Sequence, residues 1–153
     1  MHAYLLSSLN FGPVVVERLV AALPESAYDT PTAEDRFTPR EIVAHLADWE
    51  PIMRDRIRAA VESPGSTIQA YDEGRMAIDR AYARSDIHTQ TKLFVEERKK
   101  TAEYANRLTQ DQLRQTVTHS ERGLQTAEDL IGTLIGHDMY HVEQLSAGLG
   151  VNR

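Results

Sequence analysis

Apolar residues recur along most of this chain at intervals of three and four, a spacing that places them on one face of an α-helix. Runs in which β-branched and polar residues alternate, as strands require, are missing apart from the short stretch 116–118. A chain with this pattern buries its apolar residues by packing helix against helix. The sequence therefore predicts an all-α protein.

Two helices are expected in the first half of the chain. The first covers residues 2–23. The second covers residues 39–62 and has the clearest start, because Thr38 as N-cap and Glu41 at the third helical position form a capping box around a proline. Pro51 should bend this helix, since its ring crowds the carbonyl group of the preceding turn. Both helices are long enough to span a small bundle.

The second half adds a short helical stretch around residues 71–82 and a longer one over 86–108. A final helix begins after Thr126, an N-cap with Asp129 at the third position, and ends before Gly148. Long helices joined by mostly short loops close most simply as a four-helix bundle, here with one or two extra short helices. All 153 residues fit one domain of this kind.

The charge balance bears on the partners of the protein. With 23 acidic and 17 basic side chains, the formal net charge of −6 repels a nucleic-acid backbone. The short basic run Arg98, Lys99 and Lys100 lies in a helical segment beside Glu96 and Glu97. A solvated, salt-bridged helix face is expected there. The sequence thus argues against a nucleic-acid partner.

Cysteine is absent, which excludes disulfides, thiolate metal ligands and a cysteine nucleophile. Residues 1–10 lack the basic flank and apolar centre of a signal peptide. No stretch approaches the roughly 20 apolar residues that a membrane-spanning helix needs. We therefore expect a cytoplasmic protein without a membrane partner, in which any thiol chemistry uses an external thiol.

Three of the six histidines fall on the predicted inward faces of helices. On the last helix His137 and His141 continue the stripe of Leu130 and Leu134, one turn apart, at positions that leucine would otherwise fill. Two imidazoles at i and i+4 can bind one ion together. His45 lies close to the inward stripe of the second helix and can supply a third nitrogen. These three histidines are the predicted metal ligands.

The alternative for any single inward histidine is a core residue satisfied by hydrogen bonds. Three imidazoles packed together without an ion would repel one another when protonated and need separate partners when neutral, which favours a shared divalent metal ion. Three nitrogens also leave a coordination position open, as catalytic zinc sites do. The remaining histidines, His2, His88 and His119, are expected at the surface.

Neighbouring polar residues limit the chemistry. The spacing of His137 and His141 matches that of zinc peptidases, but Asp138 stands where those enzymes have glutamate, and the third ligand lies upstream. This argues against peptidase activity. Asp48 and Gln144 each follow a histidine by three residues and could orient a ligand or a metal-bound water. Exposed helix positions without such a role are the alternative for both.

Two segments resemble the signature segments of the DinB-like (DinB/YfiT-type) metal-binding four-helix bundles. They are FTPREIVAHLADWE at residues 37–50 and GHDMYHVEQL at residues 136–145, and the resemblance covers most of the chain. In that family one histidine of the second helix and an HxxxH pair of the last helix hold a divalent metal, commonly zinc or nickel. The match places these roles on His45, His137 and His141. It also implies a homodimer packed through bundle helices.

The resemblance does not fix one reaction, because DinB-like proteins include thiol-dependent S-transferases, a maleylpyruvate isomerase and many unassigned hydrolases. We expect a metal-dependent enzyme that makes a water or an external low-molecular-weight thiol nucleophilic toward a small-molecule substrate. Asp48, Tyr71 and Asp72 are candidates for a base or for pocket residues, and no catalytic residue is assigned. The alternatives are a non-enzymatic bundle stabilised by its metal, in a stress-response or interaction role, and a helical interaction module without metal.

Overall fold

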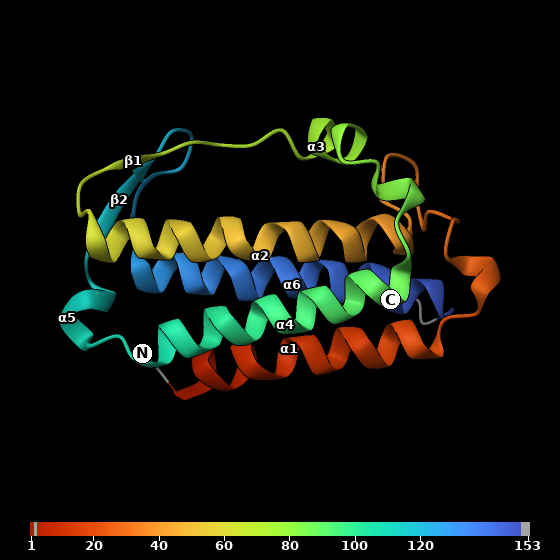
Figure 1. Cartoon of the computed structure of the whole chain (residues 1–153), viewed down its shortest axis with the longest axis horizontal. Helices are drawn as coiled ribbons and strands as arrows, with labels where there is room; N and C mark the ends of the chain where they lie inside the picture. Colours follow the sequence, from red (N-terminus) through yellow and green to blue (C-terminus); the bar gives the residue numbers. More distant parts are fainter. Residues whose placement is uncertain (2, 151–153) are drawn as a thin grey trace.

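Four long helices form the body of the protein in the computed structural model, which describes residues 1 and 3–150. They are α1 (Ala3–Ala22), α2 (Pro39–Glu62), α4 (Ile87–Asn106) and α6 (Ala127–Gly148). Figure 1 shows them lying along the long axis of the molecule, and α1 and α2 each pack on both α4 and α6. The predicted all-α four-helix bundle is confirmed.

Shorter elements connect the long helices. Helix α3 (Glu73–Asp79) and the 3₁₀ turn η2 (Tyr82–Arg84) lie in the crossover between α2 and α4, where the sequence predicted one short helical stretch. The 3₁₀ turn η1 (Glu25–Ala27) follows α1, and helix α5 (Gln110–Leu113) follows α4. The crossover that carries α3 runs along the outside of α2 (Figure 1).

The sequence pattern does not predict the small three-stranded sheet at one end of the bundle. Strand β2 (Thr116–His119) pairs antiparallel with β3 (Gly123–Thr126) and parallel with β1 (Thr67–Ile68). Gly123 has a φ of +75°, which favours glycine, and opens β3 after the hairpin turn. Strands of two and four residues are too short to show a readable alternation of apolar and polar residues.

Side-chain caps fix where α2 and α6 begin, as the sequence predicted. At the start of α2 the Thr38 hydroxyl accepts a bond from the Glu41 amide at 3.3 Å, and the Glu41 carboxylate accepts one from the Thr38 amide at 2.9 Å. Thr126 and Asp129 make the same reciprocal pair at the start of α6. Such a cap contributes about 1 kcal/mol by satisfying orphan amides. Helix α2 continues unbroken through Pro51.

Two large apolar clusters, one toward each end of the bundle, and a third cluster of three buried residues fill the interior. The first gathers around Trp49, Ile57 and Leu130, and the second around Leu46 and Phe94. All five side chains are 5% exposed or less. Burying a large apolar side chain contributes about 1.5–3 kcal/mol, so these two clusters are the main source of stability for the fold.

Arg98 lies in the bundle interior and is only 1% exposed. Its guanidinium donates to both carboxylate oxygens of Asp138, at 2.6 and 2.8 Å, and to Glu50 Oε1 at 2.6 Å. The predicted solvated basic face is therefore wrong for Arg98, although Lys99 and Lys100 are exposed. The physical reason is position, because Arg98 falls on the inward stripe of α4, four residues after a buried phenylalanine.

Helix α1 departs from a second expectation. It is 20 residues long with a mean hydropathy of 1.3, so by length and composition alone it could cross a membrane. The expectation that no stretch approaches this length was wrong, because apolar residues such as Phe11 lie on the exposed side of α1 as well as on its buried side. The core helix of a soluble protein and a signal sequence pass the same test, and Leu9, Val16 and Val20 are buried in the bundle.

Candidate metal centre

The imidazoles of His45, His137 and His141 meet where α2 packs on α6. His45 Nε2 lies 2.9 Å from His137 Nε2, which in turn lies 3.2 Å from His141 Nε2. The three potential ligand atoms are all within 4.8 Å of one another. The structure therefore brings together the three histidines that the sequence singled out, and we refer to them as the histidine triad.

Helix periodicity explains this convergence. On α6, His137 and His141 are one turn apart and follow the buried Leu134 along the same face. On α2, His45 is fully buried next to Leu46, which belongs to one of the apolar clusters. His137 is only partly buried. The triad is therefore enclosed by the two helices but has one open side.

Burial keeps the three imidazoles neutral near pH 7. Loss of solvent contact, reinforced by neighbouring histidines, lowers the pKa of His45 to about 3 and the pKa of His137 to about 2. Burial also lowers the pKa of His141 to about 4, against the raising effect of its hydrogen bond to Gln144. Neutral imidazole is the form that binds a metal ion, so the triad is in the binding form without any change of pH.

The donor atoms of the triad fit a cation better than they fit one another. The amide oxygen of Gln144 lies 2.9 Å from His141 Nδ1, which places the proton on Nδ1 and a lone pair on Nε2. The Nδ1 atoms of His45 and His137 are buried without a hydrogen-bond partner among the described residues. A proton on one Nε2 could satisfy one neighbour, whereas a divalent ion accepts all three lone pairs.

Aromatic rings border the triad, and a pocket opens beside it. Between ring centroids, Trp49 lies 5.4 Å from His45 and 5.7 Å from His137, and Phe37 lies 5.4 Å from His45. A pocket of about 250 Å³ reaches His141. We call it the triad pocket; it is lined by Asp35, Arg36, Phe37, Glu73, Gly74, Tyr140, His141 and Gln144. A small molecule in this pocket would touch the triad.

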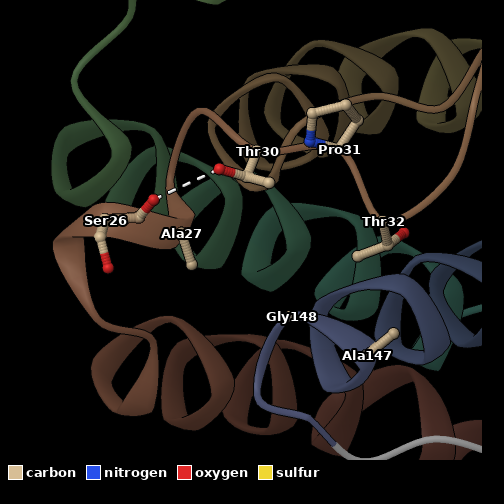
Figure 2. A pocket seen from close by; sticks show the side chains of 7 residues that line it. All are labelled: Ser26, Ala27, Thr30, Pro31, Thr32, Ala147 and Gly148. Carbon is tan, nitrogen blue, oxygen red and sulfur yellow. Dashed lines mark hydrogen bonds between the residues drawn. The ribbon is translucent and has the colours of Figure 1, made fainter.

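A larger pocket, of about 360 Å³, does not include any of these histidines. Figure 2 shows its lining of small side chains and the hydrogen bond, 3.3 Å long, that the Thr30 hydroxyl donates to the Ser26 carbonyl. The lining residues are Ser26, Ala27, Thr30, Pro31, Thr32, Ala147 and Gly148. None has an ionisable side chain, so this pocket offers neither a metal ligand of the usual kinds nor an acid or base.

Glu73 faces the triad and is not among the residues that the sequence singled out. Its Oε2 atom lies 3.7 Å from His45 Nε2. Burial raises the pKa of Glu73, against the lowering effect of Arg122 and Arg56. Only its neighbour Asp72 was a candidate, because a short helix in a long crossover has no periodicity that would place one of its residues beside α2.

Of the other polar residues that the sequence suggested for the site, one contacts the triad and the rest have structural contacts. Gln144 contacts a triad histidine, as expected of an orienting residue. Asp48 instead forms an ion pair with Arg80, which follows α3, with 2.8 Å between Nη1 and Oδ2. Asp72 is the N-cap of α3. Tyr71 packs edge-on against the buried tryptophan at 6.0 Å. Both carboxylate oxygens of Asp138 accept hydrogen bonds from the buried Arg98. The carboxylate is therefore not free to act as the base that a peptidase needs.

The remaining histidines lie apart from the triad where they are described. His88 is exposed, as predicted. His119 is 3% exposed, so its predicted place in a polar surface loop is wrong. It ends β2, and its Nδ1 accepts bonds from the amides of Glu121 and Arg122 at 3.2 and 3.4 Å as the hairpin folds over it. The predicted surface position of His2 lies outside the described residues.

Comparison with known families agrees with the resemblance seen in the two signature segments. The family model of the DinB superfamily matches residues 9–145. The chain belongs to the DinB superfamily. The matched range contains the whole triad together with Glu73. Membership in the DinB superfamily thus covers both helices that carry the candidate site.

Several known proteins are similar to this DinB-superfamily chain. One from Oceanobacillus iheyensis, named provisionally as a metal-dependent hydrolase, is 25% identical over 119 residues, 78% of this chain and 68% of the relative. YfiT from Bacillus subtilis, described as a probable metal-dependent hydrolase of unusual four-helix bundle topology, matches with a TM-score of 0.88 at 22% identity, over 97% of this chain and 87% of YfiT.

A mycothiol-dependent maleylpyruvate isomerase matches with a TM-score of 0.76 at 12% identity, over 93% of this chain but only 59% of the isomerase. At these identities the solved structures show a shared fold and do not assign a reaction to this DinB-superfamily chain. The fold of the bundle is therefore established independently of its chemistry.

Proposed function

We propose that this protein is a metal-dependent enzyme in which His45, His137 and His141 bind one divalent ion, zinc or nickel. The observation that carries the proposal is the convergence of three neutral imidazoles beside an open pocket. Such an ion lowers the pKa of a water or a low-molecular-weight thiol that it binds, which makes a nucleophile available near pH 7. The names of the similar proteins, hydrolases and a thiol-dependent isomerase, support these two kinds of nucleophile.

The side chains around the triad have separable roles in this proposal. Gln144 holds the ring of His141 in the orientation and tautomer that present Nε2. Glu73 would accept the proton that the nucleophile loses, because its carboxylate faces the triad and its raised pKa makes it a better base. Trp49 and Phe37 cover the triad with rings that exclude water. The chain has no cysteine, so a thiol nucleophile would come from outside.

The triad pocket limits the size of the substrate. Its volume of about 250 Å³ is at or below the small end of the range for ligand pockets, which suits a small electrophile. Arg36 lies over the Tyr140 ring, 4.9 Å from the ring centroid, and both residues line the pocket. The substrate would therefore enter between an aromatic ring on α6 and the start of α3.

Two assays test the enzymatic proposal with either nucleophile. Zinc- or nickel-loaded protein is incubated with 4-nitrophenyl acetate, and separately with 1-chloro-2,4-dinitrobenzene and cysteine or glutathione. His141→Ala should lose turnover in the productive assay, because it removes one ligand. His88→Ala, which changes an exposed histidine outside the triad, should keep it. Equal rates for wild type and His141→Ala in both assays would refute the proposal.

One observation favours a second candidate, a non-enzymatic bundle whose metal only holds α2 and α6 together. Glu73 is close enough to the triad to serve as a fourth protein ligand, and four protein ligands make a closed, structural site. Competition with a chelator measures the zinc affinity of Glu73→Gln. A large loss of affinity favours the structural site, whereas an unchanged affinity with lost turnover favours the role of Glu73 as a base.

A further inference from the structure

A third pocket lies between α2 and the crossover that leads to α3. Its volume is about 270 Å³, and it is lined by Ile52, Asp55, Arg56, Ile68, Gln69 and Tyr71. Arg56 is the notable residue in this lining, because its side chain is 5% exposed although arginine is rarely buried unless it is paired. We call this the Arg56 pocket.

The hydrogen bonds of Arg56 leave its charge uncompensated. Nη2 donates to the Gln69 carbonyl at 2.6 Å and Nη1 to the Met53 sulfur at 3.6 Å, while the buried Nε has no partner among the described residues. In the described part of the chain no carboxylate forms an ion pair with this guanidinium within 4.0 Å. Arg98 is also buried but binds two carboxylates.

Charges of both signs lie around Arg56, since the exposed carboxylate of Asp55 also lines the pocket, but none of them pairs with the guanidinium. Burial lowers the pKa of Arg56, and the charge of Arg122 acts in the same direction. The same two arginines also lower the pKa of His119, after the larger effect of burial. Tyr71 and Glu73 act in the opposite direction on Arg56, but neither makes an ion pair with it among the described residues. A buried cation beside a second cation is costly unless an anion joins them.

The geometry around the guanidinium directs where an anion can bind. The Arg56 Cζ atom lies 5.2 Å from the centroid of the Trp49 ring and 5.4 Å from that of Tyr71. The Nε–H group and one N–H of each Nη are not used in the hydrogen bonds above, so an edge of the guanidinium is left for hydrogen bonding. That edge matches two oxygens of a carboxylate or phosphate, which arginine binds more strongly than a neutral acceptor.

We propose that the Arg56 pocket binds the anionic group of a small molecule, a carboxylate or a phosphate, with Arg56 as the principal donor. The site is separate from the triad, because no triad histidine lines the Arg56 pocket, although Trp49 contacts both Arg56 and the rings of His45 and His137. The inference goes beyond the proposed metal chemistry and does not depend on it. Bracing of the crossover through the Gln69 carbonyl alone is the competing role for Arg56.

The single tryptophan of the chain reports on this pocket, since Trp49 contacts Arg56 directly. Metal-free protein, prepared with a chelator, is titrated with inorganic phosphate and separately with acetate, against sodium chloride at matched ionic strength. A saturable change in Trp49 emission with either anion is expected, and the anion that gives it identifies the phosphate or carboxylate class. No saturable change with either anion would overturn the proposal.

Variants separate anion binding from bracing. Arg56→Met should abolish the response, whereas Arg58→Met should keep it, because Arg58 is an exposed arginine of the same helix that pairs with Glu62. Arg56→Lys keeps the charge but loses the planar fork, and its dissociation constant should rise by about tenfold. Calorimetric titration checks each affinity independently of fluorescence. If Arg56→Met does not fold, Arg56→Lys decides, and a dissociation constant equal to that of wild type would contradict the assignment.

Because every titration uses metal-free protein, a failure here leaves the proposed metal function untouched. Conversely, loss of metal binding in a triad variant should not change the anion response.

Discussion

Acidification of the metal-free protein tests the protonation state of the triad. The pKa of His45 is about 3 in the folded protein, below the ordinary value of 6.5 that it regains when the chain unfolds. Between these values the unfolded chain takes up a proton that the folded protein excludes. The stability linked to His45 is therefore complete above pH 6.5 and is lost as the pH falls from 6.5 toward 3.

The size of the effect at pH 5 depends mainly on the unfolded chain, because His45 is still neutral there in the folded protein. That pH is about 1.5 units below the unfolded pKa, and one unit corresponds to about 1.4 kcal/mol, so the loss is about 2 kcal/mol. His137 and His141, with pKa values of about 2 and 4, lose similar amounts. The triad together should lose about 6 kcal/mol between pH 8 and pH 5.

Urea unfolding of metal-free protein at pH 8 and pH 5, followed by circular dichroism, measures this loss. His45→Leu should lose about 2 kcal/mol less than wild type between the two pH values. His88→Ala is the matched histidine control and should lose as much as wild type, because it leaves the triad intact. Carboxylates that also titrate in this range are common to all three proteins and cancel in the comparison. The same pH dependence for wild type and His45→Leu would refute the reasoning.

Three further predictions concern the buried ion pair of Arg98 and the orientation of the triad. Arg98→Met should lower the free energy of unfolding by about 3–5 kcal/mol, because it leaves two buried carboxylates unpaired; a urea-measured loss under about 1 kcal/mol would contradict this. Gly12→Ala should lower it by about 1–3 kcal/mol, since the added Cβ would stand 3.0 Å from Asp138 Oδ2, and an unchanged melting temperature would argue against that close approach. Gln144→Leu should weaken zinc binding about tenfold in chelator competition, because it removes the acceptor for His141 Nδ1, and unchanged affinity would deny Gln144 an orienting role.

The features that could be predicted from the sequence are those with local signals. Thr38 and Thr126 mark helix starts by residue type and by the acid three positions later, and both capping boxes are present. His137 and His141 could be placed because the period of one helix puts them on its buried face. His45 depended on the family resemblance as well, because its partners lie on another helix.

The features that could not be predicted depend on contacts between distant segments. Arg98 was assigned to the surface from its charge, although its position falls on the inward stripe of α4. The carboxylates that make its burial possible lie on α2 and α6, and the sequence of α4 gives no sign of them. Glu73 reaches the triad only through the path of the crossover, which no periodicity describes. His119 is buried by a sheet whose β1–β2 pairing joins segments about fifty residues apart. Such contacts appear only once the chain is folded.

The metal content of purified protein tests the metal centre most directly. After loading with zinc or nickel and exhaustive dialysis, wild type and His88→Ala should each retain about one ion per chain by elemental analysis. His137→Ala should retain close to none under the same conditions, because it removes the imidazole that lies between the other two. Near-zero metal in wild type after loading with either ion, or equal retention in His137→Ala, would contradict the assignment of the triad as a metal site.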